Sequence, residues 1–388
     1  MPTLATTDSC TGCSACYSSC PVNCIEMVKD KYGFFRPSVD LTKCINCRKC
    51  ERSCPVINKQ EKMIDIDKCY AMYTNDFDVR LQSSSGGIFS ELAKVVINKN
   101  GIVYGAVYDK SYEVVHQGIE NINDLKLLRG AKYAQSNLND TLNKVLKDLK
   151  QDRYVLFCGT PCQVAGLKSF LKNEYDKLYC IDFVCHGVPS PLAWKSFINY
   201  ILKTNNKLDL PNSINLRSKT TGWSKYSYCH EFKFNDENII CENKDSIFMK
   251  LFVGDYINGL CCSNCKFKGK NRYSDLTLGD FWGIWDIYPK MDDNKGTSLV
   301  CLNTEKGRLL INSIISDCTF KELELDVIKK YNKSYCTSSK ANENRHHILE
   351  LISEGNFRKI QKLIFSQKSK GVLNICEKLK VLKHQLIK

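Results

Sequence analysis

The sequence predicts three parts: a small α+β domain at the amino end, a larger α/β body, and a helical segment at the carboxyl end. Three observations support this division. A run of closely spaced cysteines occurs twice within residues 1–58. From residue 69 onward, short β-rich runs alternate with stretches of helical periodicity. The last part of the chain, residues 356–388, combines many basic residues with an amphipathic apolar pattern.

The cysteine run of the first part is an internal repeat. Residues 10–21 read CTGCSACYSSCP and residues 44–55 read CINCRKCERSCP, so every cysteine recurs 34 positions later. The closing prolines, Pro21 and Pro55, obey the same offset. A repeat this regular indicates two equivalent half-sites rather than eight independent thiols.

The spacing within each run is C-x2-C-x2-C-x3-C-P, which is typical of bacterial ferredoxins. In those proteins the fourth cysteine of each run binds the cluster of the other run. We therefore predict a ferredoxin-like domain with two [4Fe–4S] clusters and crossed ligation. Because so short a unit buries little apolar core, the metal should supply much of its folding free energy. The first cluster would be bound by Cys10, Cys13, Cys16 and Cys54, and the second by Cys44, Cys47, Cys50 and Cys20.

Zinc and disulfide bonds are the alternatives for these thiols. Zinc sites usually join two C-x2-C pairs across a longer loop, and neither run has that form. Disulfides need an oxidising compartment, whereas the start of the chain, MPTLATTDSC, lacks the apolar core of an export signal. No stretch approaches the length of an apolar membrane helix. The sequence therefore predicts a soluble, cytoplasmic protein.

The chain has 23 cysteines, so most of them lie outside the two runs. Cys24 follows the first run but has no counterpart in the second, where Asn58 stands, and we interpret it as a packing residue. The same interpretation, a free thiol packed as a small apolar group, applies to eight others. These are Cys69, Cys180, Cys229, Cys241, Cys301, Cys318, Cys336 and Cys376.

The net charge of +14 is concentrated at the carboxyl end, where residues 356–388 contain nine Lys or Arg and one acid. The apolar pattern of this tail predicts an amphipathic helix. Its basic face could be solvated, could dock an acidic electron-transfer partner, or could lie on a membrane surface. Nucleic acid is disfavoured, since no groove-reading motif accompanies the charge. The apolar positions are Val372, Ile375, Leu379, Leu382 and Leu386.

Three segments of the body are suited to ligands. Residues 82–91, QSSSGGIFSE, place hydroxyls and small residues at a helix start, where free N–H groups attract phosphate. An ordinary helix cap is the alternative, and the absence of G-x-G-x-x-G disfavours a Rossmann site. Residues 154–167 and 178–198 each run from strand through turn to helix. Cys162 and Cys185 lie at these turns, and the carboxyl ends of such strands line the ligand crevice of α/β sheets.

A fourth segment contains Cys262 and Cys265 in the spacing C-x2-C. Together with Cys162 and Cys185, this pair would complete the ligands of a third cluster. A zinc site, which takes the same four thiolates, and a redox disulfide are the alternatives. His186, beside Cys185, is a candidate catalytic proton relay, with a structural hydrogen bond as its alternative role.

Five stretches of the body, in this order, resemble one known family. They are QSSSGGIFS, LRGAKYAQS, VLFCGTPCQVAGL, DFVCHGVPSP and CKFKGKNRYSDLTLGDFWG, and they span residues 82–283. Together they resemble the beta-subunit family of coenzyme F-420 hydrogenases and dehydrogenases, in the version with an amino-terminal two-cluster ferredoxin domain. The resemblance implies an α/β flavin-binding body that holds FAD, with a further iron–sulfur centre beside it. It also implies two-electron chemistry on an organic acceptor, either a deazaflavin coenzyme or an unknown, polysaccharide-related substrate.

The resemblance further implies roles for individual residues. One group would lie against the phosphates of the flavin, a second would contact cofactor or substrate, and a third would lie near the flavin ring. The first group is Ser83, Ser84, Ser85, Gly86 and Gly87, the second is Arg129, Lys132 and Tyr133, and the third is Thr160, Pro161 and Gln163.

These expectations combine into one domain plan. Residues 1–58 should form the ferredoxin-type domain, 59–68 a linker, 69–302 the FAD-binding body, and 303–388 a helical region with a basic tail. We expect an oxidoreductase that passes electrons between its clusters and FAD. Its partners would be a ferredoxin or a partner redox subunit and a small-molecule acceptor. The alternative is an electron-transfer adaptor subunit of a larger redox complex, without a substrate of its own.

Overall fold

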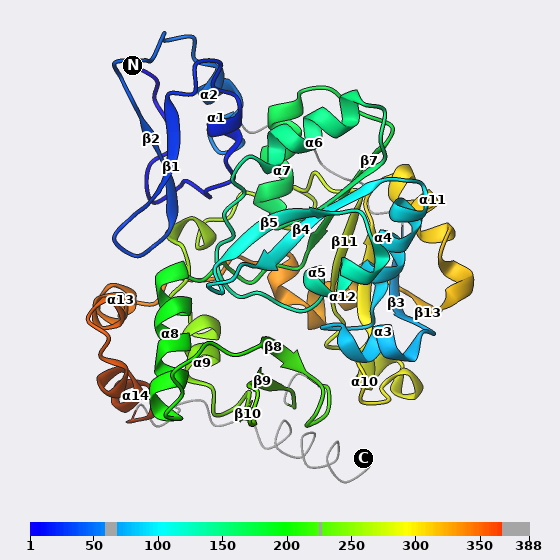
Figure 1. Cartoon of the computed structure of the whole chain (residues 1–388). Helices are drawn as coiled ribbons and strands as arrows, with labels where there is room; N and C mark the ends of the chain where they lie inside the picture. The colour runs from blue at the N-terminus through cyan, green and yellow to red at the C-terminus, as the bar shows by residue number, and fades with distance from the viewer. Residues whose placement is uncertain (59–67, 225–226, 367–388) are drawn as a thin grey trace.

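The computed structural model describes residues 1–58, 68–224 and 227–366 (Figure 1). The expected linker therefore lies outside the described residues, except for Lys68. The expected amphipathic helix of the basic tail and Cys376 also lie outside them.

The amino-terminal domain consists of one hairpin and two one-turn helices. β1 (Ile25–Lys29) pairs antiparallel with β2 (Phe35–Val39). α1 (Ala15–Ser18) lies inside the first cysteine run and α2 (Lys49–Arg52) inside the second. The sequence repeat is thus also a structural repeat, and the expected small α+β domain is confirmed.

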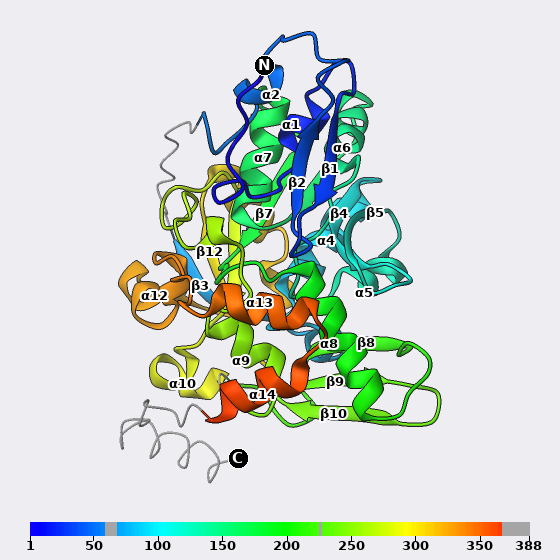
Figure 2. The same ribbon diagram turned by 90° about the vertical axis from the view of Figure 1, so that its left-hand side faces the viewer.

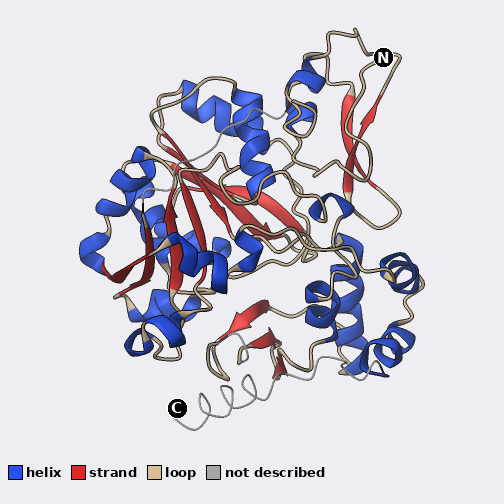
Figure 3. Cartoon of the chain, turned by 180° about the vertical axis from the view of Figure 1, so that it is seen from behind, coloured by secondary structure: helices blue, strands red, loops and turns tan. Residues whose placement is uncertain are grey.

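The body contains one eight-stranded mixed sheet, seen from behind in Figure 3. Its four central strands are parallel and its outer strands pair antiparallel. The order across the sheet is β13 (Cys318–Leu323), β3 (Cys69–Thr74), β12 (Ser298–Leu302), β11 (Leu276–Asp280), β7 (Leu178–Phe183), β6 (Val155–Cys158), β4 (Ile102–Tyr108) and β5 (Val114–Ile119).

Helices cover both faces of this sheet, as parallel central strands require. In β6, Val155 and Phe157 pack with α6 (Thr141–Lys150) and α7 (Pro161–Leu171). Leu156 points to the other face and packs with the second group of helices. That group is α4 (Ile88–Asn98), α5 (Leu125–Leu128) and α11 (Glu305–Asn312). The expected α/β body is therefore confirmed.

A second lobe packs beside the sheet (Figure 2). Its core of aromatic and aliphatic side chains includes Trp194, Phe197 and Phe232, all nearly inaccessible to solvent. Its strands β10 (Asn238–Glu242), β9 (Cys229–Lys233) and β8 (Ser213–Ser218) form a separate antiparallel sheet in that order. The helices of this lobe are α8 (Pro191–Thr204), α9 (Ile247–Val253), α13 (Arg345–Ser353) and α14 (Phe357–Ser366).

The region after residue 302 is not purely helical, which corrects the sequence expectation. Residues 318–323 form β13, the edge strand that pairs with β3. Half of its residues are polar, with Lys321 and Glu322 adjacent, and charged side chains on an edge strand resist pairing with other chains. It therefore carries little of the apolar alternation that marks a strand in sequence. The remaining short helices are α3 (Phe77–Gln82), α10 (Ile284–Ile287) and α12 (Leu325–Tyr331).

The isolated thiols mostly pack as expected. Five of the eight are buried, Cys241 is half-buried, and Cys336 is exposed, so the packing interpretation is wrong for Cys336. The buried five are Cys69, Cys180, Cys229, Cys301 and Cys318. Within the described ranges, no helix combines the length and the apolar character that crossing a membrane requires.

Candidate functional site

Four cysteines of the amino-terminal domain face one small cavity. Its thiols come from Cys10, Cys13 and Cys16 of the first run and from Cys54 of the second. Thr11, Pro37 and Val56 are among the other residues that line this cavity. This is the grouping that crossed ligation requires, because the fourth thiol belongs to the other run.

The second set of thiols lies nearer the surface. Cys20, Cys44 and Cys50 pack together in one small cluster of side chains, while Cys47 follows the exposed residues Ile45 and Asn46. Cys24 also belongs to this cluster and is buried. Its Sγ lies 3.4 Å from Sγ of Cys20, and its backbone N–H donates to the same sulfur over 3.3 Å. The packing interpretation of Cys24 therefore omits a direct contact with an expected cluster ligand.

The four cysteines expected to hold a third cluster line one cavity of about 380 Å³. Cys162 lies in the first turn of α7, and Cys185 follows β7. They meet because β6 and β7 are parallel neighbours whose carboxyl ends lie at the same edge. Cys262 ends a one-turn 3-10 helix, Leu260–Cys262, and Cys265 follows in the next turn.

The chemistry of this donor set fits a cluster. Burial raises the pKa of Cys162 well above its usual value and that of Cys185 to about 12. These thiols therefore stay protonated unless a metal replaces the proton. In the described part of the chain, no three His, Cys, Asp or Glu side chains lie close enough to hold a single metal ion. Thiols around a cavity of this size suit an iron–sulfur cube better than one zinc ion.

Two cations at this cavity would balance the negative charge of a thiolate-bound cluster. Nζ of Lys268 donates to the carbonyl oxygen of Cys185 and, over 2.8 Å, to that of Ser334. Arg272 is fully buried and donates to Asp182 over 2.9 Å. Among the described residues, Nε and Nη2 of Arg272 have no acceptor. Buried donors without partners are costly, so a bound group with acceptor atoms would satisfy them.

The third site lies where the amino-terminal domain meets the body. Thr11 and Val56 line both its cavity and the cavity of the first thiol set. Gln135 ties the two parts together, since its Nε2 donates to the carbonyl oxygen of Thr11 over 3.1 Å and its Oε1 accepts from the N–H of Phe35 over 2.6 Å. A Cβ added at Gly166 in α7 would lie 2.9 Å from Sγ of Cys13. The first and third sites are therefore neighbours.

The Ser/Gly segment 83–87 packs onto the sheet. The hydroxyls of Ser83 and Ser85 donate to the carbonyl oxygens of Val79 (2.7 Å) and Thr297 (3.1 Å). Gly86 has no room for a side chain, because a Cβ would lie 2.4 Å from the carbonyl oxygen of Met72. The half-buried Ser84 and Gly87, the residue before α4, complete the segment. Two of the three serine hydroxyls are thus already bonded within the protein.

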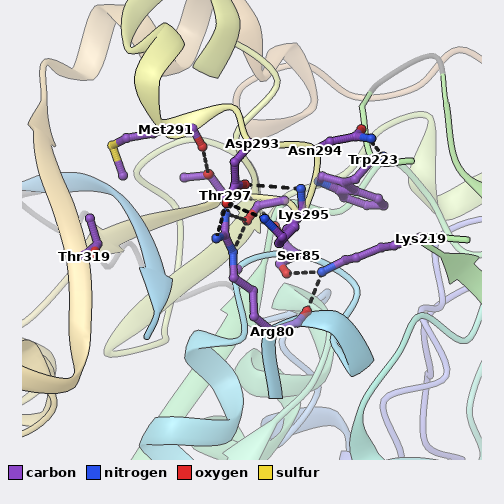
Figure 4. Close-up of polar contacts among 12 residues, drawn as sticks. Arg80, Ser85, Lys219, Trp223, Met291, Asp293, Asn294, Lys295, Thr297 and Thr319 are labelled. Carbon is purple, nitrogen blue, oxygen red and sulfur yellow. Dashed lines mark hydrogen bonds and ion pairs between the residues drawn. The ribbon is translucent and has the colours of Figure 1, made fainter. Parts of the chain in front are cut away.

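Half-buried cations lie close to this segment. Nζ of Lys219 donates to the carbonyl oxygens of Ser85 (2.7 Å) and Arg80 (Figure 4). Arg129 donates to Ser90 in α4, and Nζ of Lys132 donates to the carbonyl oxygen of Arg129 over 2.8 Å. Burial lowers the pKa of both Lys132 and Lys219 to about 7. A bound anion would raise both values again, because it favours the charged ammonium.

Sequence reasoning missed the cationic and aromatic contribution of the second lobe. Nη2 of Arg217 pairs with Oδ2 of Asp280 at 2.6 Å, and its guanidinium lies over the ring of Trp223 at 4.2 Å. The expected cofactor residue Tyr133 hydrogen-bonds to Arg217, and its ring packs against Phe252. The only sequence signal for Arg217 is two cations and an aromatic residue in LRSKTTGW, without a characteristic spacing.

The remaining expected site residues lie beside the third cavity. The N–H of Thr160 donates to Oε1 of Gln163 over 2.9 Å, forming a capping box that begins α7 with Pro161 as its first residue. This cap fixes the turn that carries Cys162. His186 lines the cavity, and its Nε2 lies 3.0 Å from Oδ1 of Asp255.

Comparisons with known proteins match two parts of the chain. Residues 9–58 match the family model for a 4Fe-4S dicluster domain. Residues 152–328 match the family model for the C terminus of the coenzyme F420 hydrogenase/dehydrogenase beta subunit. A search of curated proteins gave no match.

Among solved structures, the chain is similar to a chain of the F420-reducing [NiFe] hydrogenase complex from Methanosarcina barkeri. The two share 15% sequence identity over 81% of this chain and 97% of that chain, with a TM-score of 0.47. The two family models, unlike this distant structural similarity, assign defined residue ranges of the chain to known domains. The protein is therefore an iron–sulfur protein with a 4Fe-4S dicluster domain, and its residues 152–328 are related to the C terminus of the coenzyme F420 hydrogenase/dehydrogenase beta subunit.

Proposed function

We propose that the protein is an iron–sulfur flavoprotein oxidoreductase that passes electrons between three [4Fe–4S] clusters and FAD, coupled to an organic two-electron acceptor. One observation carries the proposal: two sets of four thiols line adjoining cavities, and Cys20, Cys44 and Cys50 of the remaining set pack together beside them in the amino-terminal domain. The second set lies nearer the surface than the first, and Thr11 and Val56 line both the first and the third cavities. Each set has the donor chemistry of a cube.

The residues that would hold FAD lie between the sheet and the second lobe. The diphosphate would lie against segment 83–87, where Arg129, Lys132 and Lys219 supply positive charge. Trp223 and Arg217 offer flat groups that could stack on a ring. When bound, a flavin stores two electrons and can exchange them singly with iron–sulfur clusters or as a pair with an organic substrate.

The family name makes the deazaflavin coenzyme F420 the first acceptor to test. A polysaccharide-related substrate is the other acceptor that we consider. His186 would serve as a proton relay near the third site, because its ring nitrogen lies within reach of Asp255.

Anaerobic purification with quantitation of iron, sulfide and flavin tests this proposal. Three cubes predict about twelve irons per chain, whereas two predict about eight. We expect one FAD per chain, and we expect the purified protein to reduce coenzyme F420 or ferredoxin when an added reductant, such as reduced viologen, supplies the electrons. A preparation that contains clusters but no flavin would overturn the flavoprotein assignment. Bound flavin without turnover of any organic acceptor would favour the adaptor subunit instead.

A matched pair of variants tests the proposed phosphate site. Lys219→Met should lower the FAD content, while Lys244→Met, at an exposed position in the same lobe, should leave it unchanged. Since bound phosphate would raise the pKa of Lys219 from about 7, FAD binding should take up protons above that pH. The FAD affinity of the wild type should therefore fall as the pH rises above about 7, and this slope should weaken in Lys219→Met. Equal FAD content in both variants would contradict the assignment.

A further inference from the structure

The two halves of the cysteine repeat have opposite surroundings. The first half faces the body, whereas the second half is largely exposed to solvent. Between the cysteine ligands, residues 34 positions apart occupy equivalent places in the two halves. These paired residues differ in size and charge, as their different surroundings require. The equivalent pairs are Thr11 and Ile45, Gly12 and Asn46, Ser14 and Arg48, Ala15 and Lys49, and Ser18 and Arg52.

The first half carries small, uncharged residues because it is covered. Ser14 and Ala15 are 2% and 0% exposed. Gly12 has a φ of +70°, and a Cβ there would lie 2.2 Å from Nε2 of Gln135 in the body. Any larger side chain at these positions would separate the domain from the body. This half is therefore shaped by an interface that already exists.

The second half carries large apolar and cationic residues on a free surface. Ile45 is 62% exposed and lies between the expected ligands Cys44 and Cys47. Other exposed apolar and cationic side chains surround it. We define the docking face as Val22, Leu41, Lys43, Ile45, Arg48, Lys49 and Arg52. Figure 2 shows α2, which carries part of this face, at the outer end of the domain, far from the second lobe.

The acids near this face are already engaged. Asp40 lies 3.2 Å from Nζ of Lys43, and Oε1 of Glu51 accepts from the N–H of Thr3 over 2.7 Å. Asp40 thus offsets Lys43, and Glu51 offsets one of Arg48, Lys49 and Arg52, so the face keeps two unmatched positive charges around an apolar centre. Such a composition suits a transient protein partner of opposite charge, because cations steer the encounter and apolar contact holds it briefly.

We propose that this docking face binds a small acidic electron-carrier protein, which exchanges single electrons with the second cluster site. The proposal rests on the proposed function and adds the partner and the place where it binds. Each encounter oxidises the carrier by one electron and reduces this protein by one. A two-electron acceptor therefore needs two encounters and takes its protons from solvent.

The charge of the face selects this occupant over a second copy of the chain. A symmetric dimer through the face would place its own cations against each other. That arrangement is unfavourable, since like charges across an interface suppress association. An acidic carrier meets no such penalty, and electron carriers use small, transient interfaces of this kind.

The test measures electron transfer to the anaerobically purified holoprotein from a reduced, acidic plant-type [2Fe–2S] ferredoxin. Each rate is divided by the rate with methyl viologen, a small mediator that needs no docking face. Arg48→Glu/Lys49→Glu should lower the normalised rate at least tenfold at low ionic strength, and should remove most of its salt dependence. The control is Lys329→Glu/Lys330→Glu on α12, which makes the same charge change at another exposed site and should keep the wild-type rate.

A normalised rate in Arg48→Glu/Lys49→Glu equal to that of the control would overturn the proposal. Wild-type protein that accepts electrons from viologen but not from the ferredoxin would also overturn it, while leaving the proposed function intact. If the wild-type protein accepts electrons from neither ferredoxin nor viologen, the proposed function itself is contradicted. Should the charge reversal disturb cluster assembly, Ile45→Ser provides a second variant. It should raise the KM for ferredoxin roughly threefold or more at unchanged iron content.

Discussion

The two cysteine runs are close copies that face different environments. In both, a residue with left-handed backbone precedes a one-turn helix: Ser14 with φ 59° before α1, and Arg48 with φ 54° before α2. The ligand spacing and the local fold are therefore shared. The residues between the ligands are not shared, and they decide whether a half packs on the body or faces solvent.

This difference shows that one motif can serve as both an interface and a free surface. The thiols of the first set are enclosed, with Cys10 and Cys13 at 9% and 8% exposure. The second set lies under a face that carries Ile45 and four exposed cations. The geometry of a metal site thus constrains only the ligands and the turns, while the intervening side chains remain free to specify the neighbour.

The largest expected effect separates the two clusters by their fourth ligands. Crossed ligation predicts that Cys54→Ala and Cys10→Ala remove the same cluster, because both thiols line one cavity. Cys20→Ala and Cys44→Ala should remove the other. Each variant should lose about four irons per chain. The measurement is iron content together with the electron paramagnetic resonance spectrum of the reduced protein.

Crossed ligation is contradicted if the residual spectra of the four variants pair in another way. A residual spectrum of Cys54→Ala that matches Cys44→Ala would mean that each run binds its own cluster. Cys336→Ala is the control, since Cys336 is exposed and lies outside all three thiol sets. It should keep the full iron content.

The next largest effect compares the loss of a buried arginine with the loss of an exposed one, measured by protein stability and cluster reduction potential. Arg272→Gln leaves Asp182 buried without its partner, which should lower stability by about 3–5 kcal/mol. It should also lower the reduction potential of the proposed third cluster, because a missing cation disfavours the added electron. Arg52→Gln is the control at the free half, where Nη2 donates to the carbonyl oxygen of Cys47. Solvent there replaces the lost charge, so the change should be small.

Redox titration and denaturant unfolding measure both quantities. Equal changes in stability and in reduction potential in the two variants would show that burial does not make the cation of the third site more important than that of the second. Asp182→Asn combined with Arg272→Gln should recover part of the lost stability but not the potential.

The sequence predicted the thiol sets because their determinants are local. The spacing of each run specifies its ligands, and Cys162 and Cys185 follow strands whose parallel pairing brings the strand ends together. β13 was missed because an edge strand needs no apolar alternation. Arg217 and Lys219 were missed for a different reason. They reach the site from the second lobe, and only the tertiary fold brings that lobe against segment 83–87.

A smaller expected effect concerns Gly12 in the first cysteine run, and it tests whether contact with the body requires a glycine there. Gly12→Ala should destabilise the protein by about 2–3 kcal/mol, because it adds a contact with Gln135 to the cost of a left-handed alanine. Asn46→Ala, at the equivalent left-handed position with φ 54°, should cost only about 1 kcal/mol. Chemical denaturation under anaerobic conditions measures the difference. Equal losses would mean that the interface does not restrict residue 12.

The smallest effect concerns the one thiol that breaks the repeat. Sγ of Cys24 lies 3.4 Å from Sγ of Cys20, and once Cys20 is a thiolate ligand only Cys24 can donate the hydrogen bond between them. Hydrogen bonds to cluster sulfurs raise the reduction potential. Cys24→Ala should therefore lower the potential of the second cluster by about 20 mV, the equivalent of ~0.5 kcal/mol for one electron.

The equivalent residue in the other half supplies the control. Nδ2 of Asn58 donates to the carbonyl oxygen of Glu51 rather than to a sulfur, so Asn58→Ala should leave the potential of the first cluster unchanged. Cys24→Ser should retain most of the wild-type potential, since a hydroxyl can donate in place of the thiol. A shift in Cys24→Ser as large as in Cys24→Ala would assign the effect to lost packing. The asymmetry of the two halves would then come from their surfaces alone.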